Sequence, residues 1–232
     1  GNLLMQINRT EDAMTHFRKA LEINPDYAET HTNLGILLVK TNRTEEAMTH
    51  FRKALEINPN DVKAHNNLGN ILLQTNRTDE AVVHFRKALE INPNLAEDHS
   101  NLGTLLLQTG RTDEAVVHFR KALEINPNLA EVYDNLGLAL FQTGQTDEAI
   151  SHYRKALEIN ADNIALLNNL AAAFLQKGQR TDAIQLLQRA LTLAKSSGNE
   201  TQAKALAGNL ERAYNPTSGR RQMFPPKSTV KR

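Results

Sequence analysis

Small and apolar residues recur every 34 residues along most of this chain. We count positions within each copy from Ala28 as position one. Leucine then occupies position seven in five consecutive copies, and alanine occupies positions 20 and 27. Glycine stands at position eight and an aromatic residue at position 24 in most copies, as at Gly35 and Phe51. A fixed period in this range indicates stacked structural repeats.

The first half of each copy has the pattern of an amphipathic helix. Leu34, Leu37 and Leu38 recur with the spacing of one helix face. Position 15 is Asn in some copies and Gly in others, as at Asn42 and Gly110. Both residue types suit the left-handed conformation that ends a helix. The sequence therefore predicts a first helix that ends at this position.

The second half of each copy predicts another helix. Thr44 and its counterparts stand two positions after the turn, where we expect an N-cap that contributes about 1 kcal/mol. Arg52 precedes Glu56 by four residues, a spacing that predicts a surface ion pair. Asn58 and Pro59 then end the helix. Each copy is thus predicted to be a helix–turn–helix unit.

The spacing, the small residues, the aromatic residue and the proline together resemble the tetratricopeptide repeat family, over roughly residues 1–197. The resemblance implies an all-α fold, a right-handed superhelical solenoid of stacked antiparallel helix pairs. One departure is position four, where the family often has a large aromatic residue and this chain has His31, His65 and His99.

The period also predicts the domain organisation. We expect a partial repeat, five further repeats of which the last is divergent, a capping helix and a disordered tail, over residues 1–27, 28–61, 62–95, 96–129, 130–163, 164–197, 198–214 and 215–232, respectively. The capping helix should bury one face, formed by Ala203, Leu206, Ala207, Leu210 and Tyr214. The tail contains Pro, Gly and five basic residues without an acidic one, a composition typical of disorder.

The beginning of the chain corresponds to position eight of a repeat, so most of one helix is missing there. We therefore expect the next helix to have an uncovered apolar stripe, to which Leu4, Ala13 and Phe17 belong. Terminal repeats normally have a polar outer face. Either the chain is a piece of a longer protein, or another copy covers this end in a head-to-tail assembly.

Composition excludes several function classes. The chain has no Cys, which excludes disulfides and thiol chemistry. It has no apolar run long enough to cross a membrane. Without its tail, the chain has 22 basic and 26 acidic residues. This net negative charge argues against nucleic-acid binding by the repeats. Localisation is cytoplasmic by default, while secretion or a periplasmic location stays open because the first repeat is incomplete.

In the tetratricopeptide repeat family, the first helices line a concave groove. The resemblance therefore implies that positions two, five, six, nine, twelve and thirteen face a partner. Position six is Asn in all five copies: Asn33, Asn67, Asn101, Asn135 and Asn169. We include with them the polar residues Asn66, Lys63, Gln74, Gln108 and Gln142 and the apolar residues Leu73, Leu107 and Phe141.

An amide can both donate and accept a hydrogen bond. The row of Asn side chains is similar to the asparagine ladder in the repeat arm of the O-GlcNAc transferases, which holds substrate chains. It predicts weak, broad binding of an extended peptide through its backbone, unless Asn is simply common at this position. A basic clamp for acidic C-termini is not expected, because Lys63 is the one basic residue at positions two, five and six.

The eight His residues occupy only positions four and 23. Copying of the repeat explains this distribution, and we expect neither a metal site nor a cofactor, although His at these two positions could meet across neighbouring repeats. No catalytic constellation is present, so we expect no enzyme. The leading hypothesis is a peptide-binding interaction module. The alternatives are a scaffold that assembles head to tail and an accessory arm of a larger enzyme such as a glycosyltransferase.

Overall fold

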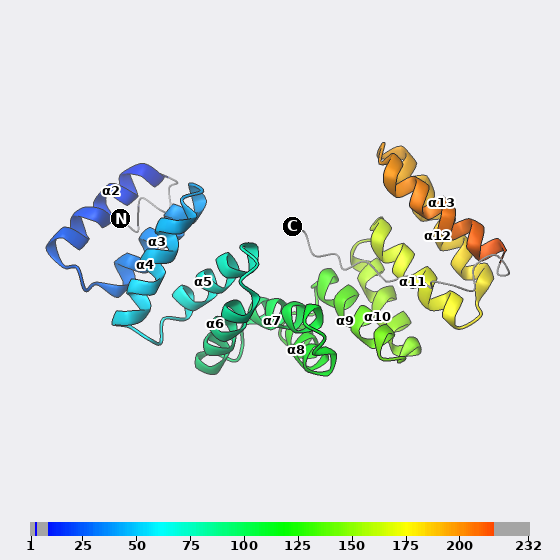
Figure 1. Cartoon of the computed structure of the whole chain (residues 1–232), viewed down its shortest axis with the longest axis horizontal. Coiled ribbons are helices and arrows are strands. Elements are labelled where there is room, and N and C mark those ends of the chain that lie inside the picture. Colours follow the sequence, from blue (N-terminus) through cyan, green and yellow to red (C-terminus); the bar gives the residue numbers. More distant parts are fainter. Residues whose placement is uncertain (1–2, 4–8, 216–232) are drawn as a thin grey trace. The chain divides into compact units, whose positions relative to one another are not determined.

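The computed structural model describes residue 3 and residues 9–215. These residues form twelve α-helices and no β-strand (Figure 1). The chain divides into two compact units, residues 1–102 and 103–232, and the division falls within one helix. The predicted all-α fold of consecutive antiparallel helix pairs is confirmed, and each unit is described below by itself.

The first unit consists of helices that pack against their neighbours in chain order, α2 on α3, α3 on α4, α4 on α5 and α5 on α6. Their bounds are α2 Thr10–Ile23, α3 Ala28–Lys40, α4 Thr44–Ile57, α5 Val62–Gln74 and α6 Thr78–Ile91, and the unit ends within α7, Ala96–Gln108. First helices are thus α3 and α5, and second helices are α2, α4 and α6.

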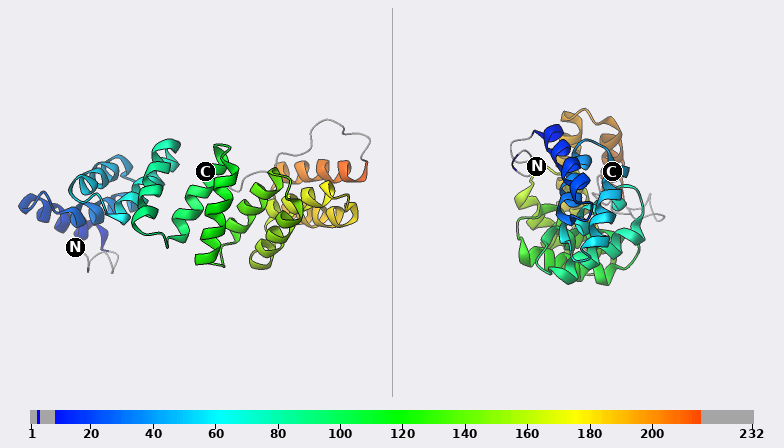
Figure 2. Two further views of the ribbon diagram at one scale, coloured as in Figure 1. Left: turned by 90° about the horizontal axis from the view of Figure 1, so that it is seen from below. Right: turned by 90° about the vertical axis from the view of Figure 1, so that its left-hand side faces the viewer.

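The second unit continues the same alternation, with each helix packed on the next from α8 to α13 (Figure 2). It contains the end of α7, followed by α8 Thr112–Ile125, α9 Ala130–Gln142, α10 Thr146–Ile159, α11 Ile164–Gln176, α12 Arg180–Ser196 and α13 Glu200–Tyr214. Here α9 and α11 are first helices, whereas α8, α10 and α12 are second helices.

Small residues allow the two helices of a repeat to approach closely. A Cβ atom added at Gly137 would lie 2.7 Å from a ring atom of Tyr153, and one at Gly35 would lie 2.7 Å from the ring of Phe51. Real Cβ atoms do not come this close, so only glycine fits at position eight in these repeats. In the four complete repeats with an aromatic residue at position 24, the alanines at positions 20 and 27 are fully buried. Burial of these side chains is the main stabilising term of each repeat.

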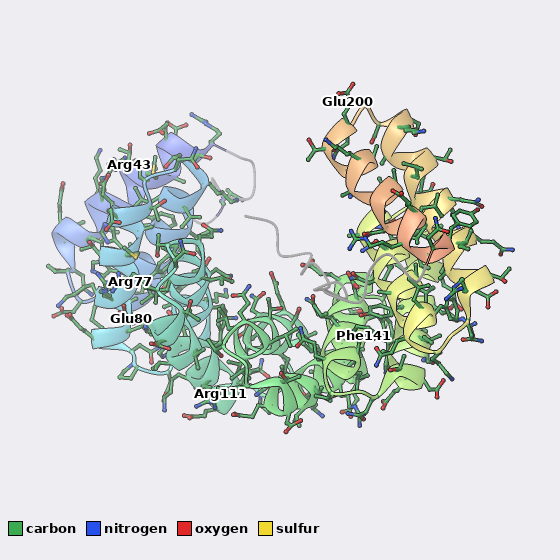
Figure 3. All side chains as sticks on the ribbon, turned by 45° about the vertical axis from the view of Figure 1, so that its right-hand side comes forward. Arg43, Arg77, Glu80, Arg111, Phe141 and Glu200 are labelled. Carbon is green, nitrogen blue, oxygen red and sulfur yellow. The ribbon has the colours of Figure 1, made fainter. Side chains whose placement is uncertain are left out.

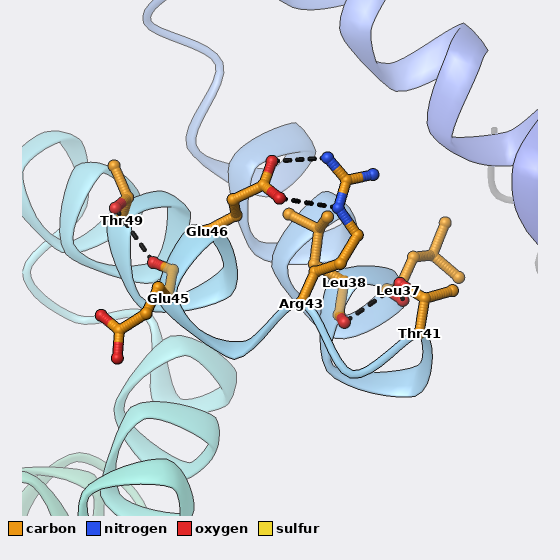
Figure 4. A network of polar contacts seen from close by, with 7 residues as sticks. All are labelled: Leu37, Leu38, Thr41, Arg43, Glu45, Glu46 and Thr49. Carbon is orange, nitrogen blue, oxygen red and sulfur yellow. Dashed lines mark hydrogen bonds and ion pairs between the residues drawn. The ribbon is translucent and has the colours of Figure 1, made fainter.

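The turn inside each repeat has the conformation that the sequence predicts. Asn42 has a φ of 59° and Gly110 a φ of 77°, both in the left-handed region. Thr41 closes the preceding helix, because its hydroxyl donates to the carbonyl oxygens of Leu37 and Leu38 (Figure 4). The predicted helix ends are confirmed, since α3 ends at Lys40, two residues before Asn42, and α4 ends at Ile57, just before Asn58.

The prediction of a threonine N-cap is wrong. Thr44 is the first residue of α4, and the residue before it, Arg43, makes no side-chain capping bond. Arg43 instead forms two hydrogen bonds with Glu46, 2.7 and 2.6 Å long (Figure 4). The same pair recurs at Arg77 and Glu80, which Figure 3 labels. The Arg43 guanidinium therefore holds Glu46 in the first turn of α4, where a threonine cap was expected.

The predicted ion pair between Arg52 and Glu56 is also replaced by another one. Glu56 pairs with Lys53, three residues before it, at 3.1 Å between Nζ and Oε2. Because both side chains are exposed, such a pair contributes little to stability.

The last described helix, α13, closes the second unit. Ala203, Leu206 and Ala213 are buried, but Ala207 and Tyr214 are exposed. The expected apolar face is therefore rotated, because Ala213 is buried where Tyr214 was expected. The tail after Asn215, for which we predict disorder, lies outside the described residues.

The expected exposed stripe at the beginning of the chain is not observed. Ala13 is fully buried and Phe17 is only 6% exposed, and their helix α2 packs on α3. Leu4 lies outside the described residues. The head-to-tail assembly therefore stays a hypothesis that no observation favours.

Candidate functional site

Positions twelve and thirteen of the first helices combine apolar and polar side chains at the surface. In the second unit, Leu107 and Phe141 are half-buried, whereas the neighbouring Gln108 and Gln142 are exposed. Figure 3 labels Phe141 on α9. In the first unit, Leu73 and Gln74 repeat the same combination on α5. Within the described part of the chain, these three glutamine side chains form no hydrogen bond.

Helix α11, the first helix of the final repeat, adds a small hollow to this surface. Its lining includes Asn168, Ala172 and Leu175, which occupy positions five, nine and twelve, and it also includes Leu187 of α12. Three of the positions that the resemblance implies for partner contact therefore lie together in space. The neighbouring Gln176 at position thirteen is exposed.

Two of the Asn side chains at position six, Asn135 and Asn169, bond to the preceding repeat. Asn135 donates from Nδ2 to the hydroxyl of Thr104 at 3.3 Å, and Asn169 donates to Asp134 at 3.1 Å. Both acceptors belong to the preceding first helix. Asn135 and Asn169 are each only 2% exposed. These two side chains therefore connect neighbouring repeats, and their burial leaves little of either amide within reach of a peptide.

The first unit shows the same connection at one position. Asn101 donates to Oδ1 of Asn70 at 3.0 Å, again from α7 to the preceding first helix. Asn67 donates to the backbone carbonyl of Lys63 within its own helix, at 2.8 Å. Asn33 is half-buried on α3, and Lys63 is exposed. Three of the five amides at position six thus join neighbouring repeats.

A buried carboxyl group, which the sequence analysis missed, lies close to Asn66. Asp98 is only 3% exposed, and neither its Oδ2 nor Oδ1 of Asn66 has a hydrogen-bond partner. Burial, together with the nearby charge of Glu97, raises the pKa of Asp98 to about 7. The signal was present in the sequence, because position three is apolar or Thr in the other copies, for example Val132.

Two His pairs form within single repeats. The sequence had suggested that such a contact could occur between neighbouring repeats instead. The Nδ1 atoms of His31 and His50 are 2.8 Å apart, and those of His65 and His84 are 2.9 Å apart. Burial lowers the pKa of both His50 and His84. The described residues contain no group of three or more metal-binding side chains.

Comparison with known proteins identifies the repeats. Family models described as tetratricopeptide repeat match residues 62–128, 99–162 and 140–210. A further one, described as TPR repeat, matches residues 1–42 and 37–75. The chain belongs to the tetratricopeptide repeat family.

Several solved structures share this TPR fold. YrrB, described as a TPR protein with an unusual peptide-binding site, is 27% identical, with a TM-score of 0.73 over 82% of this chain and 97% of YrrB. MamA from Desulfovibrio magneticus RS-1, in a structure that begins at its residue 41, is 22% identical, with a TM-score of 0.68 over 73% of this chain and 96% of that one. PilF from Pseudomonas aeruginosa is 24% identical, with a TM-score of 0.61 over 82% of this chain and 92% of PilF.

No curated protein matches the sequence. Among the helices of the described residues, none combines the length and apolar character that crossing a membrane requires.

Proposed function

We propose that this TPR protein is a non-catalytic interaction module that binds an extended segment of a partner protein along its first helices. The observation that carries the proposal is the row of exposed glutamines beside half-buried apolar residues in the second unit. The row consists of Gln108, Gln142 and Gln176 next to Leu107, Phe141 and Leu175. The description of YrrB as a peptide-binding TPR protein supports the same function.

The chemistry of this row suits an extended backbone. Each glutamine amide offers two donors and one acceptor, so it can pair with a peptide N–H and C=O group at once. The apolar neighbour at position twelve can contact an alternate side chain of the same segment. Because the amides of Asn135 and Asn169 are buried and bonded to a neighbouring repeat, we assign the main polar contacts to the glutamines.

The expected affinity is modest. Each hydrogen bond contributes about 0.5–1.5 kcal/mol net, and ordering of the peptide opposes binding. Burial of the Phe141 ring against the partner adds the largest single apolar contribution. We therefore infer broad specificity, with the apolar side chains of the partner deciding which segments bind best.

The proposal is tested by selecting binders from a random peptide library on the wild-type protein and measuring their dissociation constants by fluorescence anisotropy. We expect Phe141→Ala, and the combined variant Gln108→Ala/Gln142→Ala, to weaken binding by about tenfold or more. The matched controls Val83→Ala and Val117→Ala remove exposed apolar groups from second helices and should leave the affinity unchanged. Equal binding by all four variants would refute the proposed site.

A further inference from the structure

Two adjoining cavities lie in the second unit, beside helices α10, α11 and α12. They have volumes of about 380 and 400 Å³ and share Arg154 and Phe174 in their lining. Their remaining walls come mainly from the second helices α10 and α12, including Ile150 and Leu186. None of the residues assigned above to peptide binding lines either cavity.

Among the described residues, the guanidinium group of Arg154 has no acidic partner, whereas that of Arg120 in the preceding repeat has one. Arg120, at the same repeat position, forms an ion pair of 2.7 Å with Glu148. The counterpart of Glu148 in the next repeat is Asp182, whose side chain is one methylene shorter. Asp182 lines one of the two cavities together with Arg154, yet among the described residues Arg154 forms no ion pair.

The neighbouring residue Lys155 departs from the repeat in the same way. Its counterparts Lys53 and Lys121 pair with the glutamate three residues later, at 3.1 and 2.9 Å. Lys155 instead places Nζ 5.7 Å from the ring centroid of Tyr133 and forms no ion pair in the described part of the chain. Glu158, the glutamate in the equivalent position, lines the same cavity.

The ring of Phe174 contacts the Arg154 side chain at the cavity wall. The Arg154 Cζ lies 5.5 Å from the centroid of the Phe174 ring, which is a cation–π contact. Leucine occupies the corresponding position in the four preceding repeats. The other cations of the lining already have partners, because Lys177 pairs with Asp147 and Arg189 pairs with Asp162.

We propose that Arg154 and Lys155 form a second binding site, which takes an acidic side chain of a partner protein next to an apolar one. A carboxylate matches the fork of a guanidinium and can accept two hydrogen bonds from it. The apolar side chain that follows would lie against Phe174, Ile150 and Leu186. The occupant is thus an extended acidic segment, whereas the glutamine row contacts the peptide backbone of its partner.

The probe for this site is a short fluorescein-labelled peptide in which Glu alternates with Phe. Its C-terminus is amidated, so that only side-chain carboxylates are tested. The comparison peptide has Gln in place of Glu. Anisotropy titrations at low salt should show wild-type protein binding the Glu peptide about fivefold more tightly than the Gln peptide, and this preference should shrink as salt screens the charges.

Variants then locate the binding. Arg154→Gln should remove the preference for Glu, Arg154→Lys should retain part of it, and Asp182→Asn should strengthen it by removing a repelling charge. Arg120→Gln is the matched control, because this arginine already has a partner, and it should retain the preference. Lys155→Gln should weaken the preference and provides a second test if Arg154→Gln melts at a lower temperature.

Equal affinity of the wild-type protein for the two peptides, or an unchanged preference in both Arg154→Gln and Lys155→Gln, would overturn this inference. The result is independent of the proposed function. Gln108→Ala/Gln142→Ala should leave the Glu preference intact, and Arg154→Gln should leave intact the binding of peptides that the glutamine row selects.

Discussion

His65 and His84 face each other in one repeat, with their Nδ1 atoms 2.9 Å apart. Nε2 of His65 lies 3.1 Å from the carbonyl oxygen of Pro59, which can only accept a hydrogen bond. Nε2 therefore carries the proton, and Nδ1 of His65 must accept from Nδ1–H of His84. Two protonated rings cannot keep this contact, because both Nδ1 atoms would then be donors.

The pair makes stability depend on pH. Burial lowers the pKa of His84 to about 4 and also lowers that of His65, whereas an unfolded His has a pKa near 6.5. The folded state thus binds fewer protons, and its stability is present above pH 6.5 and is lost as pH falls towards 4. We expect His84→Gln to reduce this loss by about 1–3 kcal/mol in urea unfolding at pH 4.5 compared with pH 7. An identical pH dependence of the variant would contradict the assignment.

Asp98 makes the folding stability depend on pH with the opposite sign. Its pKa is about 7 in the folded protein against 3.8 as the ordinary value, so the folded state binds more protons. Its contribution is fully present below pH 3.8 and is lost as pH rises to 7. Asp98→Val, which introduces the residue found at Val132, should therefore stabilise the protein at pH 8 by roughly 1–4 kcal/mol. It should have little effect at pH 4, and equal effects at the two pH values would argue against a raised pKa.

The contact between Gly137 and Tyr153 predicts a cost for any side chain at position eight. Gly137→Ala would place a methyl group 2.7 Å from the ring, so we expect a loss of about 1–3 kcal/mol in thermal or urea unfolding. Gly208→Ala is the matched control in α13, because the nearest side-chain atom is 3.9 Å from the added Cβ. That variant should be neutral or stabilising by up to about 1 kcal/mol, since alanine favours helix. A stable Gly137→Ala protein would mean that the helices can separate.

The amides at position six should affect stability more than binding. Asn135→Ala removes a hydrogen bond between neighbouring first helices and should lower the free energy of unfolding by about 1–2 kcal/mol. Gln142→Ala, on the same helix, removes an exposed amide that forms no bond within the described residues and should leave unfolding unchanged. Calorimetry of both variants distinguishes a structural Asn ladder from one that is free for peptide.

The sequence was sufficient to predict the helices, because their ends depend on local residues. Asn42 and Gly110 adopt the left-handed turn, and the Asn that precedes each Pro ends a second helix. The sequence did not reveal the partner of Asn135, since the direction of a side-chain hydrogen bond depends on how two repeats stack. For the same reason it predicted neither the Arg43–Glu46 pair in place of a threonine cap nor the burial of Asp98.

The central claim is that a partner segment binds along the first helices, and the absence of Cys allows a direct measurement. Gln142→Cys places a unique thiol in the glutamine row, whereas Val117→Cys places one on α8, where the native side chain is 65% exposed. Each is labelled with an environment-sensitive fluorophore and titrated with a library-selected peptide. The account predicts a saturable change in emission at residue 142 and none at residue 117. A change only at residue 117, or an unaltered signal at residue 142 when binding is complete, would contradict it.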